Sequence, residues 1–138
     1  SEEGSISEIS WVEKNVTSLI EDSKINPSKI ILGVPFYTRL WIRNNANNTL
    51  TTKVYSMKNC DEFIKSNSLT KKMDEASGQN YVECTKGNTE YKLWIEDGDS
   101  IKNRVNIINK FKLAGISGWQ KGLETEDIWS VINSNIEK

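Results

Sequence analysis

The stretch that most constrains the fold is residues 29–41, which read Lys-Ile-Ile-Leu-Gly-Val-Pro-Phe-Tyr-Thr-Arg-Leu-Trp. Residues 30–34 form a short apolar run, which is typical of a strand buried on both faces in a parallel sheet or barrel. Pro35 has no N–H to donate, so we expect strand pairing to stop there. In parallel α/β folds, ligands bind at the carboxyl ends of the strands. We therefore look for a binding site among the side chains that follow: Phe36, Tyr37, Arg39 and Trp41.

A helix before this strand gives the helix-then-strand order of a parallel fold. Ser10 is expected to cap this helix, with Glu13 completing a capping box, and the helix is expected to end near Ser23. Its apolar positions lie on one stripe and should face a sheet: Val12, Val16, Leu19 and Ile20. Residues 1–9 are polar and are expected to be loose.

The same order returns at the end of the chain. Residues 97–100, Asp-Gly-Asp-Ser, should cap a helix with four inward positions, Ile101, Val105, Ile108 and Phe111. Residues 113–119 form a strand in which Gly115 and Gly118 indicate close approach of backbone or ligand. Thr125 is expected to cap a final helix with Ile128, Trp129, Ile132 and Ile136 on its buried side.

Residues 44–97 have the pattern of a small antiparallel sheet with one helix. Strands are expected at residues 51–55, 69–74, 79–85 and 89–95, and Lys86-Gly87-Asn88 supplies the turn of the clearest hairpin. Ser56 should cap a helix with Met57, Cys60, Phe63 and Ile64 inward. We therefore expect an α+β chain in three parts: residues 1–43, an inserted unit at residues 44–97, and residues 98–138.

Composition argues against several kinds of function. The 18 basic and 19 acidic residues leave a net charge of −1, which provides no footprint for nucleic acid, and no run is long enough for a membrane span. Histidine is absent, which removes Ser/His and Cys/His catalysis and most transition-metal sites. We expect no metal site and no cofactor. Cys60 and Cys84 are expected to be core thiols, with a disulfide as the alternative.

Two segments resemble family 18 glycoside hydrolases, the chitinase-like (β/α)8 barrels. Residues 33–39, Gly-Val-Pro-Phe-Tyr-Thr-Arg, resemble the G-x-P-x-Y-G-R segment after the seventh strand of that family. Residues 113–119, Leu-Ala-Gly-Ile-Ser-Gly-Trp, resemble its eighth strand. Residues 56–100 are similar to the α+β insertion of many members, and residues 77–81 and 93–97 look most like the bacterial cell-wall and spore-cortex N-acetylglucosaminidases. Because a complete TIM barrel needs roughly 250 residues, the resemblance implies the C-terminal part of a larger protein.

The resemblance also implies site residues. The family places a tryptophan under the sugar being cleaved, and Trp119 matches it, while Tyr37 and Arg39 match residues that line the same pocket. The residues alone leave alternatives open, since Trp119 could be core and Arg39 could pair with a surface carboxylate. Thr38 stands where the family more often has glycine. Trp41 and Trp94 are weaker candidates for the same cleft.

The family's D-x-x-D-x-D-x-E motif, whose glutamate is the catalytic acid, does not occur in this chain. Residues 97–99, Asp-Gly-Asp, lack its spacing, and capping explains them better. We therefore expect no catalytic residue here, and a chain that is inactive alone within a parent glycosidase that cleaves β-1,4-linked N-acetylglucosamine polymers.

The expected partner is a polysaccharide, and the expected location is extracellular, at the cell wall or spore of a bacterium. The alternatives are a catalytically silent glycan-binding protein and a protein-interaction unit. Self-association through bare strand edges is also expected, with a rearranged flank that covers those edges as the alternative.

Overall fold

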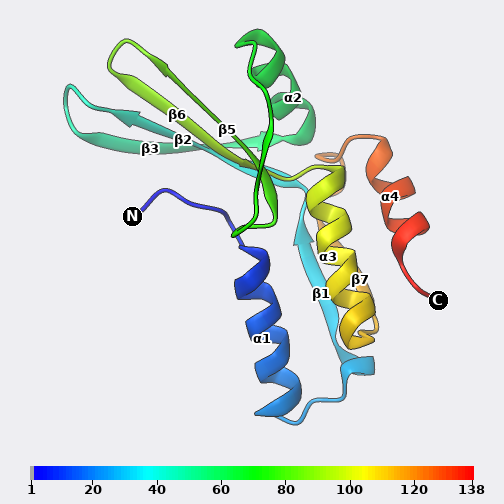
Figure 1. Ribbon diagram of the computed structural model, residues 1–138. Helices are drawn as coiled ribbons and strands as arrows, with labels where there is room; N and C mark the ends of the chain where they lie inside the picture. The colour runs from blue at the N-terminus through cyan, green and yellow to red at the C-terminus, as the bar shows by residue number, and fades with distance from the viewer. Residues whose placement is uncertain (1) are drawn as a thin grey trace.

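The computed structural model describes residues 2–138 as a mixed α+β chain built from two units (Figure 1). The parallel unit contains the two-stranded sheet of β1 (Ile31–Pro35) and β7 (Gly115–Trp119), the short 3-10 helix η1 (Pro27–Lys29), and three helices, α1 (Ile9–Glu21), α3 (Gly98–Phe111) and α4 (Asp127–Asn135). None of the helices in the described part is long and apolar enough to cross a membrane.

The antiparallel unit is a five-stranded sheet in the order β3-β2-β6-β5-β4 with one helix. Its elements are β2 (Tyr37–Asn44), β3 (Thr49–Ser56), α2 (Met57–Ser66), β4 (Lys72–Asp74), β5 (Gln79–Lys86) and β6 (Thr89–Ile95). The predicted hairpin of β5 and β6 is confirmed, with Lys86 opposite Thr89 across the turn.

The antiparallel sheet begins earlier than the sequence predicted. Residues 37–43 were grouped with the first barrel-derived part, but they form β2 and pair with β3 and β6. The cause is local, because only Phe36 separates the two strands, so the chain passes directly from one sheet into the other. Division of the chain into barrel-derived and inserted parts remains a proposal, and the pairing supports placing its first boundary at Tyr37.

In the parallel sheet, β1 and β7 pair from Ile31 opposite Gly115 to Pro35 opposite Trp119. The prediction of two buried faces is wrong for this chain, because α3 covers only one face and Ile31 on the other is 62% exposed. Pairing includes Pro35 opposite Trp119, and the next N–H, that of Phe36, still donates to the Trp119 carbonyl. The missing N–H of Pro35 therefore does not interrupt the hydrogen bonds between the strands, contrary to the prediction.

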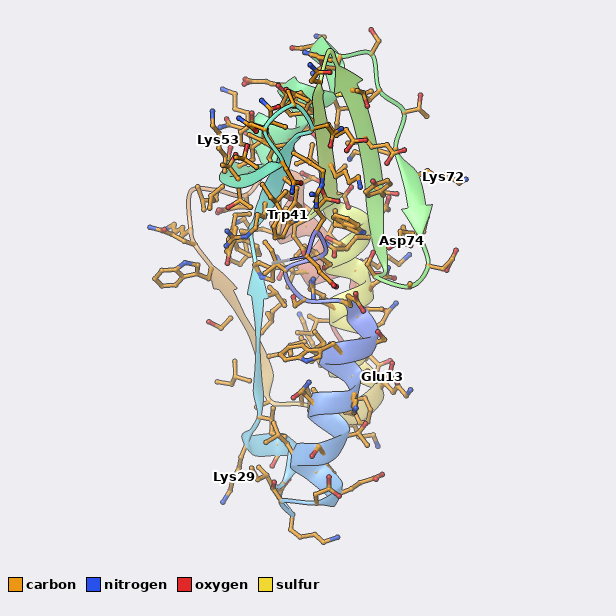
Figure 2. The ribbon with its side chains drawn as sticks, turned by 90° about the vertical axis from the view of Figure 1, so that its left-hand side faces the viewer. Glu13, Lys29, Trp41, Lys53, Lys72 and Asp74 are labelled. Carbon is orange, nitrogen blue, oxygen red and sulfur yellow. The ribbon has the colours of Figure 1, made fainter. Side chains whose placement is uncertain are left out.

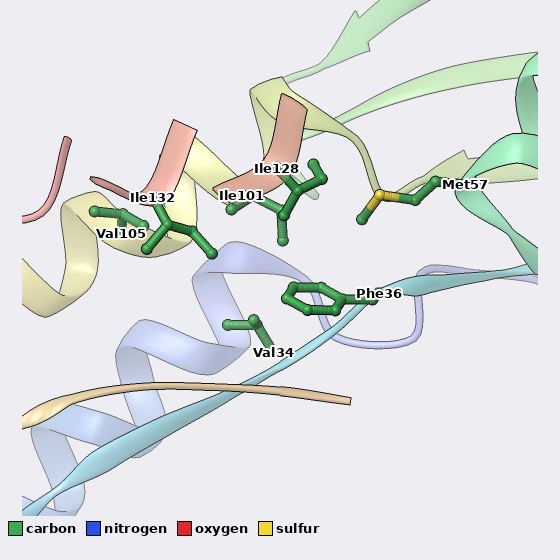
Figure 3. Close-up of a cluster of buried hydrophobic side chains, with 7 residues drawn as sticks. All are labelled: Val34, Phe36, Met57, Ile101, Val105, Ile128 and Ile132. Carbon is green, nitrogen blue, oxygen red and sulfur yellow. The ribbon is translucent and has the colours of Figure 1, made fainter. Parts of the chain in front are cut away.

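The covered face packs into a core that also joins the two units (Figure 3). Seven buried side chains form it: Val34, Phe36, Met57, Ile101, Val105, Ile128 and Ile132. Phe36 is fully buried, and a Cβ at Gly118 would lie 2.2 Å from its ring. Gly118 is therefore closely approached, but by the Phe36 side chain and not by backbone or ligand as predicted. At Gly115 no protein atom lies within 4 Å of an added Cβ, so no backbone approaches it closely.

A separate core lies between the antiparallel sheet and α2. Its buried members are Leu40, Cys60, Val82, Leu93 and Ile95. Cys60 and Cys84 are free thiols, and burial raises the pKa of the Cys60 thiol to about 11. The predicted inward face of α2 is confirmed, since Phe63 and Ile64 pack against the same core.

Two of the four predicted helix caps are confirmed. Ser56 accepts a hydrogen bond from the Asn59 N–H, and Asp97 forms a capping box with Ser100. The caps at Ser10 and Thr125 are wrong. α1 starts one residue earlier because the Ile9 N–H donates to the Ser77 carbonyl, and the Thr125 hydroxyl points to the Met57 sulfur, 3.7 Å away.

Some predicted inward positions are exposed. Leu19 on α1 is 39% exposed and Trp129 on α4 is 45% exposed. The Trp129 indole N–H donates to the Glu124 carboxylate at the surface, while the ring makes an edge contact with Phe36. β7 also starts at Gly115, two residues later than predicted, because Lys112 takes a left-handed conformation that ends α3.

Candidate functional site

A cavity of about 300 Å³ opens at the carboxyl ends of β1 and β7, where the sequence predicted a site. Its walls come from both strands, from the start of β2 and from the segment before α1: Ile6, Ser7, Gly33, Val34, Pro35, Tyr37, Ser117 and Trp119. The structure thus brings together two of the three predicted binding residues, Tyr37 and Trp119. None of the described residues that line the cavity is charged.

Trp119 presents its side chain rather than burying it. The side chain is 68% exposed, whereas the backbone is fixed by pairing with Pro35 and by a 2.6 Å hydrogen bond from the Phe36 N–H to the Trp119 carbonyl. Trp119 belongs to none of the three hydrophobic cores of the described residues, and its role in sugar binding stays a prediction. An indole held by a rigid strand and open to solvent can stack on a flat apolar surface.

Arg39 lies next to this cavity but does not line it. It belongs to a neighbouring cavity of about 420 Å³ with Trp41, Leu50, Thr51 and Thr52. Its Nη1 donates to the Thr52 hydroxyl at 3.0 Å, so the guanidinium is directed across the hairpin of β2 and β3. Because side chains two residues apart share one face of a strand, Arg39 continues the face of β2 that starts at Tyr37.

Thr38, between them, faces the opposite way and is fully buried. Its hydroxyl accepts a 2.9 Å hydrogen bond from the Glu96 N–H, just past the end of β6. A glycine, which the resemblance would lead one to expect at this position, has no hydroxyl. Thr38 therefore adds a hydrogen bond between β2 and the segment that leads into α3.

The segment of residues 3–7, here called the strap, crosses the face of the antiparallel sheet that carries Trp41 (Figure 2). The Glu3 carboxylate accepts hydrogen bonds from Arg43 and Lys92. The Lys92 hydrogen bond, followed by that of Arg43 and by both positive charges, holds the pKa of the Glu3 carboxyl below its usual value. The Trp41 indole N–H donates to the Gly4 carbonyl at 2.7 Å. The expectation that this region is loose is thus not met, and sequence reasoning missed Ile6 and Ser7 as cavity residues.

A buried ion pair holds the inner end of the strap. Arg104 on α3 is 2% exposed and pairs with the fully buried Glu96, while its Nη2 donates to the Ser7 carbonyl at 2.9 Å. Ser100 and Gln79 also donate to the Glu96 carboxylate. Burial raises the pKa of Glu96, and the Arg104 charge and the hydrogen bonds oppose that rise.

The carboxylates nearest the Arg104–Glu96 ion pair have structural roles. Asp97 caps α3 and pairs with Lys71, and Asp99 accepts a hydrogen bond from Asn80. The capping interpretation of residues 97–99 is therefore confirmed. Across residues 2–138 there is no group of three or more His, Cys, Asp or Glu side chains arranged to hold a metal.

The model of the glycosyl hydrolases family 18 matches residues 3–124 of this chain, so the chain belongs to that family. A curated relative is the uncharacterized glycosylase YvbX of Bacillus subtilis (strain 168), which is 23% identical over 134 residues. That match covers 95% of this chain but only 37% of YvbX, so the chain spans little more than a third of its relative.

Two solved structures have the same fold over 99% of the chain. The spore cortex-lytic enzyme SleL of Bacillus megaterium QM B1551 superposes with a TM-score of 0.87 at 22% identity, and the match covers 32% of SleL. A chitinase from Chromobacterium violaceum ATCC 12472 superposes with a TM-score of 0.85 at 16% identity, with 41% of that protein covered. The expected chitinase-like fold is confirmed by both.

Proposed function

We propose that this chain forms the saccharide-binding part of a glycosidase that cleaves β-1,4-linked N-acetylglucosamine polymers. The observation that carries the proposal is the cavity at the carboxyl ends of β1 and β7, in which Tyr37 lies beside an exposed Trp119. Family membership and the superposition on a spore cortex-lytic enzyme and a chitinase support it.

The roles follow from the chemistry of the side chains. A pyranose ring has an apolar face that stacks on an indole, and Trp119 offers one on a rigid strand. The Tyr37 hydroxyl can donate to a sugar oxygen or N-acetyl group from the same cavity. Arg39 extends the binding surface along β2, where its remaining N–H groups can reach the next sugar.

Hydrolysis needs a group that this chain does not contain. In substrate-assisted cleavage the substrate's own N-acetyl oxygen attacks the anomeric carbon, and the enzyme supplies a carboxylic acid that protonates the leaving oxygen. The D-x-x-D-x-D-x-E motif that carries this acid is missing from the 138 residues. The chain alone is therefore proposed to bind saccharide without cleaving it.

Peptidoglycan of the cell wall or spore cortex is the proposed polymer. SleL is a spore cortex-lytic enzyme, and the likeness to it favours that substrate and an extracellular location at the wall or spore. Chitin is the alternative substrate, which the superposed chitinase represents. The alternative function is glycan binding by a catalytically silent protein. In that case the longer protein carries another residue in place of the glutamate of the motif.

Titration of the chain with the N-acetylglucosamine tetramer tests the proposal. The indole N–H resonance of Trp119 should shift and saturate, whereas the glucose tetramer, which lacks N-acetyl groups, should shift it less at the same concentration. No hydrolysis product should form in either mixture. The proposal would be contradicted if the Trp119 resonance responded to neither sugar. It would also be contradicted if product formed and this activity disappeared on mutation of a carboxylate in this chain.

A further inference from the structure

We propose that Glu96 is a positioning residue for the Tyr37–Trp119 cavity, because its buried carboxylate fixes the part of the wall that the strap supplies. That part consists of Ile6 and Ser7. Glu96 lines none of the cavity, so its effect on a bound ligand is indirect. The identity of the ligand as a saccharide rests on the proposed function, whereas the hydrogen bonds that fix the strap do not depend on it.

Two hydrogen-bond paths run from the Glu96 carboxylate to the strap. On one path the Gln79 side-chain amide donates to Glu96 Oε1 at 2.9 Å, and the Gln79 side-chain oxygen accepts a hydrogen bond from the Ser5 hydroxyl. On the other path the Arg104 guanidinium binds the same Glu96 oxygen, and its Nη2 donates to the Ser7 carbonyl at 2.9 Å. The two paths reach the strap on either side of its cavity-lining isoleucine, so they hold that residue from both directions.

The hydrogen bonds of this network are shielded from water. Glu96 is fully buried, and Gln79 and Arg104 are only 1% and 2% exposed. The second carboxylate oxygen, Oε2, accepts from the Ser100 hydroxyl at 2.7 Å and from the Arg104 Nε at 3.2 Å. Both oxygens of the carboxylate therefore have partners, and a buried network with every member satisfied is rigid.

The outer end of the strap has its own anchors on the antiparallel sheet. The Glu3 carboxylate binds Arg43 and Lys92. The Trp41 indole N–H donates to the Gly4 carbonyl. Because these contacts do not involve the Glu96 network, a variant that breaks the network should loosen the inner end of the strap without releasing it from the sheet. A loosened wall must be ordered again when a ligand binds, and this ordering lowers affinity.

Gln79→Met tests the role of the network, because it breaks one path and leaves the Arg104–Glu96 ion pair intact. The variant should bind the N-acetylglucosamine tetramer about three- to tenfold more weakly, as followed through the Trp119 indole resonance. The backbone amide order parameters of residues 5–7 should fall in the same variant.

Asn80→Leu is the matched control. Asn80 is the next residue on β5 and is also buried, but its amide donates to Asp97 and Asp99 and not to the strap. Both variants thus replace a buried amide at the start of β5 with an apolar side chain. Asn80→Leu should change neither the affinity for the tetramer nor the order of the strap.

Arg104→Lys breaks the other path and decides the question if Gln79→Met does not fold. Lysine keeps a positive charge beside Glu96, but it lacks the planar fork that reaches both this carboxylate and the Ser7 carbonyl. The affinity for the tetramer and the order of residues 5–7 should therefore fall in this variant too.

The outcomes separate this proposal from the proposed function. Folded Gln79→Met or Arg104→Lys with wild-type affinity overturns the positioning role and leaves the proposed function standing. Equal losses of affinity in Gln79→Met and Asn80→Leu, or weaker binding with unchanged order of the strap, would overturn it as well. A wild-type chain whose Trp119 resonance does not respond to the tetramer overturns the proposed function and this inference together.

Discussion

Arg104 and Glu96 form a buried ion pair that joins α3, the end of β6 and the strap in one network. Arg104 is 2% exposed and Glu96 is fully buried, and the Arg104 guanidinium also holds the Ser7 carbonyl at 2.9 Å. Since Ser7 lines the cavity with Trp119, this pair supports the wall of the candidate site from behind.

Arg104→Met should destabilise the chain by about 3–5 kcal/mol, because it leaves the Glu96 carboxylate buried without its partner. Urea denaturation measures the loss, and Lys102→Met, an exposed change on the same helix, is the matched control. The double variant Glu96→Gln with Arg104→Met should be more stable than Arg104→Met alone. A single variant as stable as the control would show that the pair contributes little.

Gly118→Ala should cost about 1–3 kcal/mol, because the new methyl group would meet the fully buried Phe36 ring. Gly115→Ala lies on the same strand with open space around its Cβ and should be near neutral. Equal stability of the two variants in thermal or urea denaturation would contradict the packing described here.

The Glu3 carboxyl should titrate below its ordinary pKa of 4.5, because Lys92 and Arg43 stabilise the ionised form. A lowered pKa in the folded state means that this contribution to stability is complete above pH 4.5 and is lost as the pH falls through the lowered value. Carbon NMR of the carboxyl group measures it, and Lys92→Met should raise it. An ordinary pKa in the wild type would indicate a strap that is not bound to the sheet.

Self-association is expected for the 138-residue chain, since β1 and β7 each have one unpaired edge in the two-stranded sheet. Ile31, 62% exposed on β1, adds an apolar side chain on the open face. Sedimentation velocity at micromolar concentration should show a dimer or larger species, and Ile31→Lys should shift it toward monomer. A wild-type monomer at every concentration would refute this expectation.

Local signals explain which parts of the fold could be predicted. Alternating side chains and a Gly-Asn turn predicted the hairpin of β5 and β6, and the caps at Ser56 and Asp97 depend on residues within three positions. The cap at Ser10 failed because a distant carbonyl, that of Ser77, receives the Ile9 N–H and sets the helix start.

The candidate site was predictable only in part, for a similar reason. Trp119 and Tyr37 follow strands whose apolar runs are visible in the sequence, so their convergence at one sheet end could be expected. The strap could not, because its polar residues are fixed by partners far along the chain, such as Lys92 and Arg104. No local pattern in residues 3–7 reports those contacts.

The affinity of Trp119→Ala for the N-acetylglucosamine tetramer tests the central claim most directly. The variant removes an exposed side chain, and Trp11→Ala, which removes a 58% exposed indole on α1, is the matched control. We predict that Trp119→Ala weakens binding at the Tyr37 cavity about tenfold, measured through the Tyr37 ring resonances, while Trp11→Ala leaves it unchanged. Equal affinity of the two folded variants would contradict the assignment of Trp119 as the sugar-stacking residue.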